Sequence, residues 1–410
     1  MSLTIVIVGT LDTKSEEIAY FREQIERRGH RAIVVDCSIL GTSNVHADIT
    51  KDDVALAAGD TIEAVKNLGD EAKALERMAI GVAKVVRDLH SSGSLDGIFA
   101  LGGSMGTFLG LSAMKVLPLE VPKVMLSTVA VTPFIRPEMA PGDVILISAI
   151  VDLWGLNSLI RGLLENAAGV TVAAAEASRA WSLRKSRLQK KPVGVTTMGT
   201  AVCRYLPHIK PLLEQAGYEV LVFHTIGTGG RFLEQLVSQD WLGGVMDLAT
   251  NELVNEICGG SYIAGPERLQ TAGRKGVPQL VSVGGCEAFG WGRGMETLPE
   301  HFKSRTIQLH SKLTFAVKAT KEEMAAAANL MAEKLNQSKG PVTVVLPMRG
   351  FSERDKEGKV FYDPEGRRAF RDTLRAQLRP EILLKELDQH INDEAFSREV
   401  VKLFLSMRGE

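Results

Sequence analysis

Two segments rich in glycine and hydroxyl residues have the composition of anion-binding loops. They are Gly9 to Lys14 (GTLDTK) and Gly102 to Thr107 (GGSMGT). Glycine lets the backbone approach a phosphate closely, hydroxyl groups can donate hydrogen bonds to it, and Lys14 adds a positive charge. The second segment is the better phosphate candidate because its small residues obstruct a ligand least, although it lacks the Walker lysine and the GxGxxG of dinucleotide sites.

Each segment also has a structural explanation. Asp12 or Thr13 can cap a following helix whose first turn contains Glu16 and Glu17, and the glycines of the second segment can pack a tight turn against a sheet. Asp36 ends the next apolar run, where nucleotide-binding α/β folds place a partner for a ribose hydroxyl. A solvated acid at the end of a strand explains Asp36 equally well, so the sequence leaves these alternatives open.

A second group of candidate residues lies in the second half of the chain. The segment from His224 to Arg231 (HTIGTGGR) combines an imidazole, a glycine-rich loop and a cation, which suits an anionic substrate. Asp247 and Glu252 flank a turn after another apolar run, and their carboxylates could hold a metal or accept a proton. We predict these four residues as the catalytic ones, with a hydrogen-bonded structural role for His224 and helix capping around Glu252 as the alternatives.

Alternating apolar runs and helical segments must position these loops. Five runs in the first part of the chain predict strands near residues 4–8, 31–35, 97–101, 121–126 and 144–151. Their alternation with helical segments predicts a doubly wound parallel sheet that is covered on both faces. In such a sheet the loops that leave the carboxyl ends of the strands share one edge. The two glycine-rich segments and Asp36 are therefore expected at that edge.

The same pattern restarts after Pro192. The run from Thr4 to Thr10 (TIVIVGT) is echoed by the run from Val193 to Thr200 (VGVTTMGT), and later segments correspond as well. We predict two Rossmann-like domains, residues 1–185 and 190–410. An internal duplication explains the likeness, and the general similarity of βαβ units is the alternative explanation. A cleft between them is the expected ligand site. Near the end of the chain, residues 367–378 and 380–390 are predicted to be helical.

Composition excludes several classes of protein. The 410 residues carry a formal net charge of -1 with 45% hydrophobic residues, so there is no electrostatic footprint for nucleic acid. The four cysteines show no CxxC or zinc-finger spacing, which fits a reducing compartment. Charged residues interrupt the most hydrophobic stretch, and the start of the chain lacks the features of a signal peptide. We expect a cytoplasmic protein without a membrane or nucleic-acid partner.

The ordered set of motifs resembles the ATP-binding-domain family shared by the N-terminal region of the tomato mosaic virus resistance protein and many bacterial proteins. The motifs that carry the resemblance are the two glycine-rich segments, VPKVMLST at Val121 to Thr128, IVDLWGLN at Ile150 to Asn157, LVFHTIGTGGR, the turn from Asp247 to Glu252, and AGPERL at Ala264 to Leu269. Essentially the whole chain is covered. The resemblance implies ATP bound in the first domain and self-association into a homo-oligomer.

The nucleotide contacts expected from the resemblance and from the loops together fall on Gly9, Thr10, Asp12, Thr13, Lys14, Asp36, Gly102, Gly103, Ser104, Gly106, Thr107, Ser127 and Thr128. The metal is unknown, and the sequence leaves open whether Mg²⁺ accompanies ATP. The leading functional hypothesis is an ATP-binding enzyme that acts on a small anionic metabolite in the interdomain cleft. A nucleotide-gated regulatory protein without turnover and a nicotinamide-dependent oxidoreductase are the alternatives, the latter weakened by the missing GxGxxG.

Overall fold

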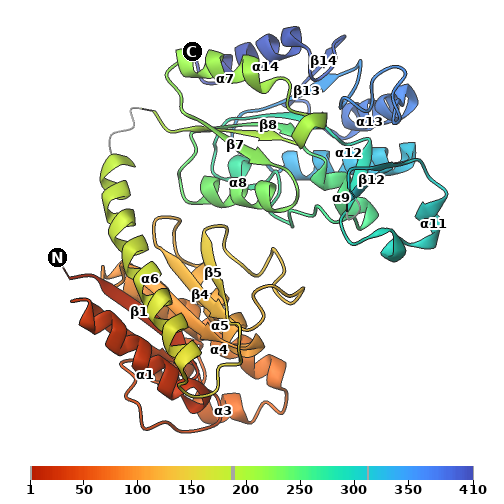
Figure 1. Cartoon of the computed structure of the whole chain (residues 1–410). Coiled ribbons are helices and arrows are strands. Elements are labelled where there is room, and N and C mark those ends of the chain that lie inside the picture. Colours follow the sequence, from red (N-terminus) through yellow and green to blue (C-terminus); the bar gives the residue numbers. More distant parts are fainter. Residues whose placement is uncertain (1, 186–189, 312–313, 410) are drawn as a thin grey trace. The chain divides into compact units, whose positions relative to one another are not determined.

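The chain folds into two α/β domains, which confirms the predicted fold class (Figure 1). A computed structural model describes residues 2–185, 190–311 and 314–409. The chain divides into residues 1–188 and residues 189–410, called the N-terminal and C-terminal domains below. Within the described residues, no helix combines the length and the hydrophobicity that crossing a bilayer requires.

The N-terminal domain is built on a five-stranded parallel sheet with the order β2-β1-β3-β4-β5. The chain leaves β1 toward one side for β2 and then returns to the other side for β3. The carboxyl ends of β1 and β3 therefore form the switch point at which doubly wound sheets bind ligands. The strands are β1 (Thr4–Gly9), β2 (Arg31–Asp36), β3 (Gly97–Gly102), β4 (Lys123–Ser127) and β5 (Val144–Ser148).

Helices cover both faces of this sheet. One face packs against α1 (Leu11–Arg27) and α6 (Ser158–Lys185), where the Phe21 ring stacks on Phe99 at a centroid distance of 3.6 Å. The other face packs against α2 (Lys51–Ala57), α3 (Ile62–Lys66), α4 (Glu71–Ser91) and α5 (Ser104–Lys115). The four central strand positions of β1 and β3 are completely buried, which explains why these runs are apolar without alternation.

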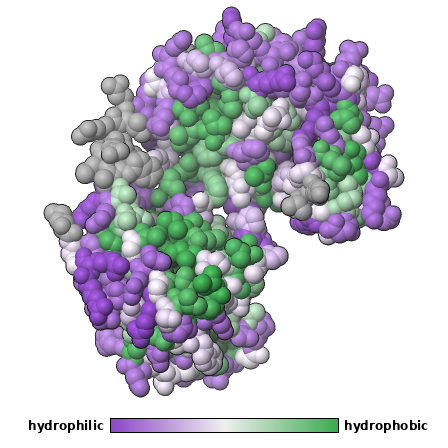
Figure 2. Space-filling model, in the orientation of Figure 1, coloured by the Kyte–Doolittle hydropathy of each residue, from purple (hydrophilic) through white to green (hydrophobic). Residues whose placement is uncertain are grey.

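Strand β5 at the edge of the sheet is less covered. Hydrophobic residues reach the surface of each domain in the view of Figure 2. Ile145 and Leu146 of β5 are among the exposed hydrophobic residues of the N-terminal domain. In the segments that flank β5, Val131, Ile150 and Trp154 are also exposed. The sheet therefore has one covered edge and one edge with apolar side chains in contact with solvent.

The C-terminal domain contains a six-stranded parallel sheet with the order β14-β13-β9-β8-β6-β7. From β7 to β13 this is the strand order of the first sheet, so β6 and β8 here correspond to β1 and β3 there. The strands are β6 (Val193–Thr197), β7 (Val220–His224), β8 (Gly244–Ala249), β9 (Gln279–Gly284), β13 (Val342–Pro347) and β14 (Leu383–Leu387). The shared topology is what a duplication would produce.

A smaller antiparallel sheet with the order β10-β12-β11 joins this domain after β9. Its strands are β10 (Ala288–Trp291), β11 (Ile307–Leu309) and β12 (Phe315–Lys318). The helices of the domain are α7 (Leu206–Gln215), α8 (Thr228–Ser238), α9 (Glu252–Cys258), α10 (Thr271–Arg274), α11 (Glu300–Lys303), α12 (Lys321–Leu335), α13 (Pro364–Gln377) and α14 (Glu394–Ser406), with 3₁₀ turns at Gly199–Ala201 and Met295–Thr297.

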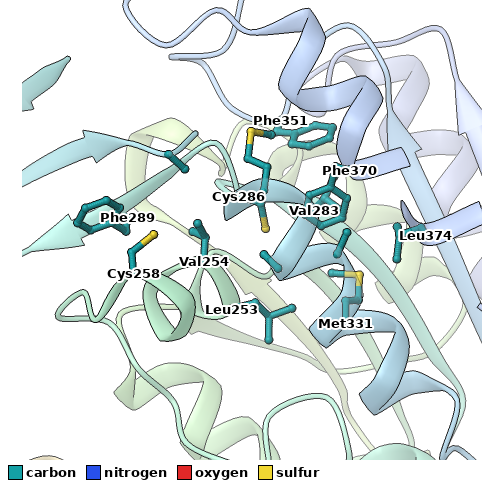
Figure 3. Close-up of a cluster of buried hydrophobic side chains, with 14 of the residues drawn as sticks. Leu253, Val254, Cys258, Val283, Cys286, Phe289, Met331, Phe351, Phe370 and Leu374 are labelled. Atoms are coloured by element: carbon teal, nitrogen blue, oxygen red, sulfur yellow. The ribbon is translucent and has the colours of Figure 1, made fainter. Parts of the chain in front are cut away.

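The largest core of the C-terminal domain lies between the parallel sheet, α9, α12 and α13. Figure 3 shows Leu253 and Val254 of α9 with Cys286, Met331 and Phe370 in this cluster. Cys286 is fully buried, and burial raises the pKa of its thiol to about 12. The side chain therefore contributes to packing.

The predicted helix over residues 380–390 is wrong. Residues 383–387 form β14, which pairs in parallel with β13 along its length. The run Ile-Leu-Leu-Lys-Glu-Leu fits one face of a helix as well as an edge strand. The unpaired backbone groups of β13 decide between the two, because a neighbouring strand satisfies them and a helix does not.

Candidate functional site

A cavity of about 550 Å³ lies at the switch point of the N-terminal domain. It is bounded by the loops after β1, β2 and β3, by the start of α4 and by Trp154. Its lining residues are Thr10, Asp12, Thr13, Lys14, Cys37, Ile39, Leu40, Lys66, Gly69, Asp70, Glu71, Ala74, Leu75, Gly102, Gly103, Ser104, Met105, Gly106, Leu109 and Trp154. Eight of the thirteen residues predicted to contact a nucleotide are among them.

The N-terminus of α5 opens into this cavity with free backbone donors. Gly103 occupies the N-cap position and no side chain caps the helix. The backbone N–H groups of Ser104, Met105 and Gly106 make no hydrogen bond within the described residues, whereas that of Thr107 already donates to the carbonyl of Gly103. Free N–H groups and the positive end of a helix dipole together favour an anion.

Glycine is required for this arrangement at Gly102. A Cβ atom at that position would lie 2.8 Å from the Cα atom of Gly106. The backbone of β3 therefore runs directly into the first turn of α5 with no room for a side chain. This close approach gives the pattern of glycines a packing reason as well as a binding one.

The N-terminus of α1 differs because the protein's own side chains occupy it. The N–H of Leu11 donates to Asp36 Oδ1 at 3.1 Å, and the N–H of Asp12 donates to Ser38 Oγ at 3.0 Å. The same Asp36 oxygen also accepts from the N–H of Ser38 at 2.9 Å. In this geometry Asp36 fastens β2 to α1, and it does not line the cavity in the way a ribose partner would.

The loop after β1 still contributes side chains to the cavity. Thr10 and Thr13 lie with their hydroxyl oxygens 3.0 Å apart. The ammonium group of Lys14 donates to the carbonyl of Leu153 and lies 5.7 Å from the ring centroid of Trp154. Trp154 is 83% exposed. Lys14 therefore joins α1 to the segment after β5 at the rim of the cavity.

Besides Asp36, four of the predicted nucleotide contacts do not line the cavity. Gly9 has no space for a side chain, since a Cβ atom there would lie 2.5 Å from Ile18 Cδ1. Thr107 is fully buried, and its hydroxyl lies 2.7 Å from the hydroxyl of Ser127 in β4. The N–H of Thr128 donates to the carbonyl of Gly102 at 3.2 Å. Thr107, Ser127 and Thr128 therefore hold α5 against the sheet, whereas Gly9 lets α1 pack closely on β1.

The apolar part of the cavity was missed by the sequence analysis. Ile39 and Leu40 follow β2, while Ala74 and Leu75 lie in the first turn of α4. Neither segment has a motif, and only the fold brings them beside the α5 N-terminus. An apolar compartment next to an open anion site has the composition of a site for a ligand with a flat apolar part and a phosphate.

The C-terminal domain has a smaller cavity of about 250 Å³ at its own switch point. Predicted residue His224 lies at its edge, at the end of β7. The other lining residues are Met198, Gly199, Thr200, Ile226, Asn251, Tyr262, Ala288, Phe289, Gly290, His310, Thr314, Phe315, Ala316 and Arg354. Loss of solvent around the ring lowers the pKa of His224, so this imidazole is neutral at neutral pH.

The other three predicted catalytic residues do not line this cavity. Glu252 is buried, and its Oε1 accepts from the N–H of Gly227 at 2.8 Å and from the N–H of Gly230 at 3.2 Å. The protein's own carboxylate thereby fills the N-terminus of α8, where we expected an anionic substrate. Arg231 donates to the carbonyl of Ile263 at 3.3 Å.

Asp247 and Glu252 belong to a buried ionic cluster around Arg268. The guanidinium donates to Glu252 Oε2 at 2.6 Å and to Asp247 Oδ1 at 2.7 Å, and Glu234 lies 3.7 Å away. Desolvation raises the pKa of Glu252 and of Glu234 in spite of Arg268. Desolvation disfavours the charge of Arg268, but Asp247 and Glu252 outweigh it and raise the pKa of the guanidinium.

This cluster corrects the interpretation of Asp247 and Glu252 as groups that face a substrate. Their oxygens are used within the domain, since Asp247 Oδ1 also accepts from the hydroxyl of Thr196 at 2.9 Å. Arg268 lies in the AGPERL motif, but nothing in its local sequence shows that three carboxylates surround it. Among the described residues, no three or more histidine, cysteine, aspartate or glutamate side chains are grouped as metal ligands.

Comparison with known proteins assigns a family to the whole chain. Residues 3–180 match the N-terminal domain, and residues 190–408 the C-terminal domain, of the uncharacterised protein family UPF0261. A UPF0261 protein of Brucella suis is 36% identical over 400 residues, covering 98% of this chain and 94% of that protein. A UPF0261 protein of Clostridium tetani is 36% identical over 410 residues, covering 99% of both chains.

A plant protein is similar to the chain as well. The tomato mosaic virus resistance protein Tm-1 of Solanum lycopersicum is 30% identical over 429 residues, which cover 98% of this chain and 55% of the plant protein. Both domains described above therefore have counterparts in about half of that longer chain.

Proposed function

We propose that this chain, which belongs to the uncharacterised protein family UPF0261, binds ATP in the cavity of its N-terminal domain. The phosphates would lie at the N-terminus of α5, and the base would lie among Ile39, Leu40 and Leu75. One observation carries the proposal: the backbone N–H groups of Ser104, Met105 and Gly106 face a cavity of about 550 Å³ and have no hydrogen-bond acceptor in the described part of the chain.

The side chains around this helix end support the same proposal. Ser104 can add a hydroxyl donor, and Lys14 can exchange the carbonyl of Leu153 for a phosphate oxygen with little movement of its stem. The choice of ATP among the nucleotides rests on the resemblance of the motifs to an ATP-binding family. Mg²⁺ would enter with the phosphates, and Asp12 is the carboxylate of the loop after β1 that lines the cavity.

A nicotinamide cofactor is less well supported than ATP. Such a site uses an acid at the end of the second strand as the partner of a ribose hydroxyl. Here Asp36 Oδ1 already accepts from two backbone N–H groups, at 3.1 Å and 2.9 Å. Binding a ribose in that way would break the link between β2 and α1.

We further propose that the protein is an enzyme acting on a small anionic metabolite, because the C-terminal cavity carries a neutral histidine and an arginine that nucleotide sensing does not need. A regulatory protein that binds ATP without turnover is the alternative. The tomato relative, named as a virus resistance protein, is a reason to keep this alternative. Release of phosphate from ATP in the presence of a panel of small carboxylates and sugar acids distinguishes the two.

Calorimetry with a matched pair of leucine variants tests the ATP site. Leu40 lines the cavity and is 73% exposed, whereas Leu56 in α2 lies outside it and is 71% exposed. Leu40→Ala should weaken ATP binding about fivefold by removing apolar contact with the base, while Leu56→Ala leaves it unchanged. Equal affinities of the two variants, or binding of NAD in preference to ATP, would overturn the proposal.

A further inference from the structure

The C-terminal cavity contains a cation that lacks a counter-ion. Arg354 is half-buried at the cavity wall and takes part in no salt bridge with any of the described residues. Its guanidinium contacts Nε2 of His310, a second basic side chain of the same wall. A guanidinium that loses part of its hydration normally gains a carboxylate in exchange. Within the described residues no carboxylate forms a salt bridge with Arg354, although the charge of Glu287 acts on it.

Glu287, whose charge acts on Arg354, does not provide the missing partner. Glu287 is completely buried, and its Oε1 accepts from the hydroxyl of Ser352. Its Oε2 is buried without a hydrogen-bond partner among the described residues. Desolvation and the neighbouring charge of Asp355 raise the pKa of Glu287 to about 7. A carboxyl group that is partly protonated at neutral pH leaves much of the charge on Arg354 uncompensated.

The remaining wall of the cavity has an apolar side and a polar side formed by His224. Ile226 and Tyr262 form an apolar side, together with Ala288 of β10 and Ala316 of β12. His224 lies at the end of β7, and no hydrogen bond holds its ring among the described residues. A volume of about 250 Å³ admits a molecule of roughly the size of an aromatic acid and excludes a nucleotide.

We propose that this cavity binds a small carboxylate with an apolar body, whose carboxylate group pairs with Arg354 while the body lies against Ile226 and Tyr262. His224 shares the cavity as a neutral imidazole that can exchange a proton with the bound molecule. The inference rests on the proposed enzyme function, because it names the anionic molecule's chemical class and its position. It is independent of the ATP site, all of whose lining residues belong to the other domain.

The test uses benzoate as the probe and the full-length protein. Ligand-observed NMR compares benzoate with benzamide, which has the same shape without the charge, and with acetate, which has the charge without the ring. Benzoate should bind at least about tenfold more tightly than either, because each comparison removes one of the two proposed contacts. Signals of His224 and His310 in the wild-type protein should shift when benzoate is added.

Variants of the protein test whether benzoate binds in this cavity. Arg354→Gln should weaken benzoate binding at least about tenfold, since it removes a charged hydrogen-bond donor. Arg398→Gln is the matched control, because Arg398 lies on the surface of α14 in an exposed pair with Glu394. ATP binding is measured on the same samples, so that loss of benzoate binding with intact ATP binding reports on this cavity alone and confirms that the variant is folded.

Three results would overturn the proposal: no binding of benzoate to the wild-type protein, equal binding of benzamide, or equal affinities of Arg354→Gln and Arg398→Gln. If Arg354→Gln does not fold, His224→Gln serves as the second variant, and its His310 signal should still shift with benzoate. An absent shift of His310 would then contradict the placement. Benzoate binding without ATP binding would leave this inference standing and remove the ATP proposal.

Discussion

The loop after β3 and the loop after β8 occupy the same position in two sheets of the same strand order. The first leaves backbone N–H groups without an acceptor among the described residues, whereas the second supplies a carboxylate that accepts from such groups. Gly103, Ser104 and Gly106 leave the N–H groups of α5 open to a cavity. In the C-terminal domain, Glu252 follows β8 and turns inward to accept from Gly227 and Gly230 at the N-terminus of α8. One domain leaves a helix end open to a cavity, and the other fills a helix end with its own carboxylate.

This difference separates binding from stability at two helix N-termini, each of which follows a strand of its domain's parallel sheet. A helix N-terminus filled from within contributes to the folded state at all times, whereas an open one contributes only when a ligand arrives. In our proposals, ligand binding in the C-terminal cavity accordingly uses side chains such as Arg354 and His224, while ligand binding in the N-terminal cavity uses backbone N–H groups. The following predictions test the two halves of the comparison.

Removal of the internal carboxylate should have the largest effect. Glu252→Ala leaves Arg268 with fewer partners and two backbone donors unsatisfied, so we expect the C-terminal domain to lose about 3–5 kcal/mol of unfolding free energy. Glu256→Ala, at a half-buried position on the same helix, is the control and should change the free energy by no more than about 0.5 kcal/mol. Urea unfolding provides the measurement. A loss below about 1 kcal/mol for Glu252→Ala would contradict the comparison.

The second prediction concerns the cost of burying acids in the C-terminal domain. Glu287 has a pKa of about 7 in the folded state against a usual value of 4.5. Between these values the folded domain binds more protons than the unfolded chain, so this group makes stability fall as the pH rises. Glu287→Gln should remove that loss, at most about 3 kcal/mol between about pH 4.5 and pH 7.

Urea unfolding of Glu287→Gln and the wild-type protein at about pH 5 and about pH 8 measures this effect. The variant should gain clearly more stability relative to the wild-type protein at the higher pH than at the lower pH. The glutamine keeps an acceptor for the hydroxyl of Ser352, so packing changes little. A gain of the same size at both pH values would show that titration of Glu287 is not the cause.

A smaller loss of stability is expected when the side-chain acceptor at the N-terminus of α1 is removed. Asp36→Ala removes the acceptor for the N–H groups of Leu11 and Ser38 and should destabilise the N-terminal domain by about 1–2 kcal/mol. Asp88→Ala, at an exposed position of α4, is the control. Thermal unfolding compares the two variants. Equal melting temperatures would mean that Asp36 is free for a ligand, as the sequence first suggested.

The smallest change in stability should follow from filling the open end of α5. Gly103→Asp places a carboxylate at the N-cap, where a Cβ atom has room because its nearest neighbour, Thr128 Oγ1, lies 3.7 Å away. We expect the N-terminal domain to gain about 0.5 kcal/mol. Gly103→Asn supplies a neutral cap for comparison. A loss of stability measured by thermal unfolding would mean that the N–H groups of α5 are not available to an anion.

Much of this fold could be predicted from the sequence, because the buried strands are continuous apolar runs between turn residues. The N-terminal site was predicted in part for the same reason: the loops after β1 and β3 must share an edge. The sequence could not show that Asp36 turns toward Leu11, because a strand-end acid has the same pattern whether it binds a ribose or a backbone N–H. Tertiary contacts alone decide this.

The C-terminal site was harder to predict. His224 was found from its place after a strand, but Arg354, Tyr262 and His310 come from segments without motifs. Asp247 and Glu252 looked like catalytic acids because carboxylates after strands often are. Their burial with Arg268, which lies sixteen residues beyond Glu252, depends on a long-range contact. Strand patterns predict which loops meet, but they do not predict which side chains pair with each other.

The affinity of Gly103→Asp for ATP tests the central claim most directly. If the open N-terminus of α5 binds the phosphates, the added carboxylate should occupy the same N–H groups and repel them, and it should weaken ATP binding at least about 100-fold. Gly103→Asn, without the charge, should weaken binding less than about tenfold. Calorimetry that finds the affinity of Gly103→Asp for ATP unchanged, in a protein that melts no lower than wild type, would contradict the account.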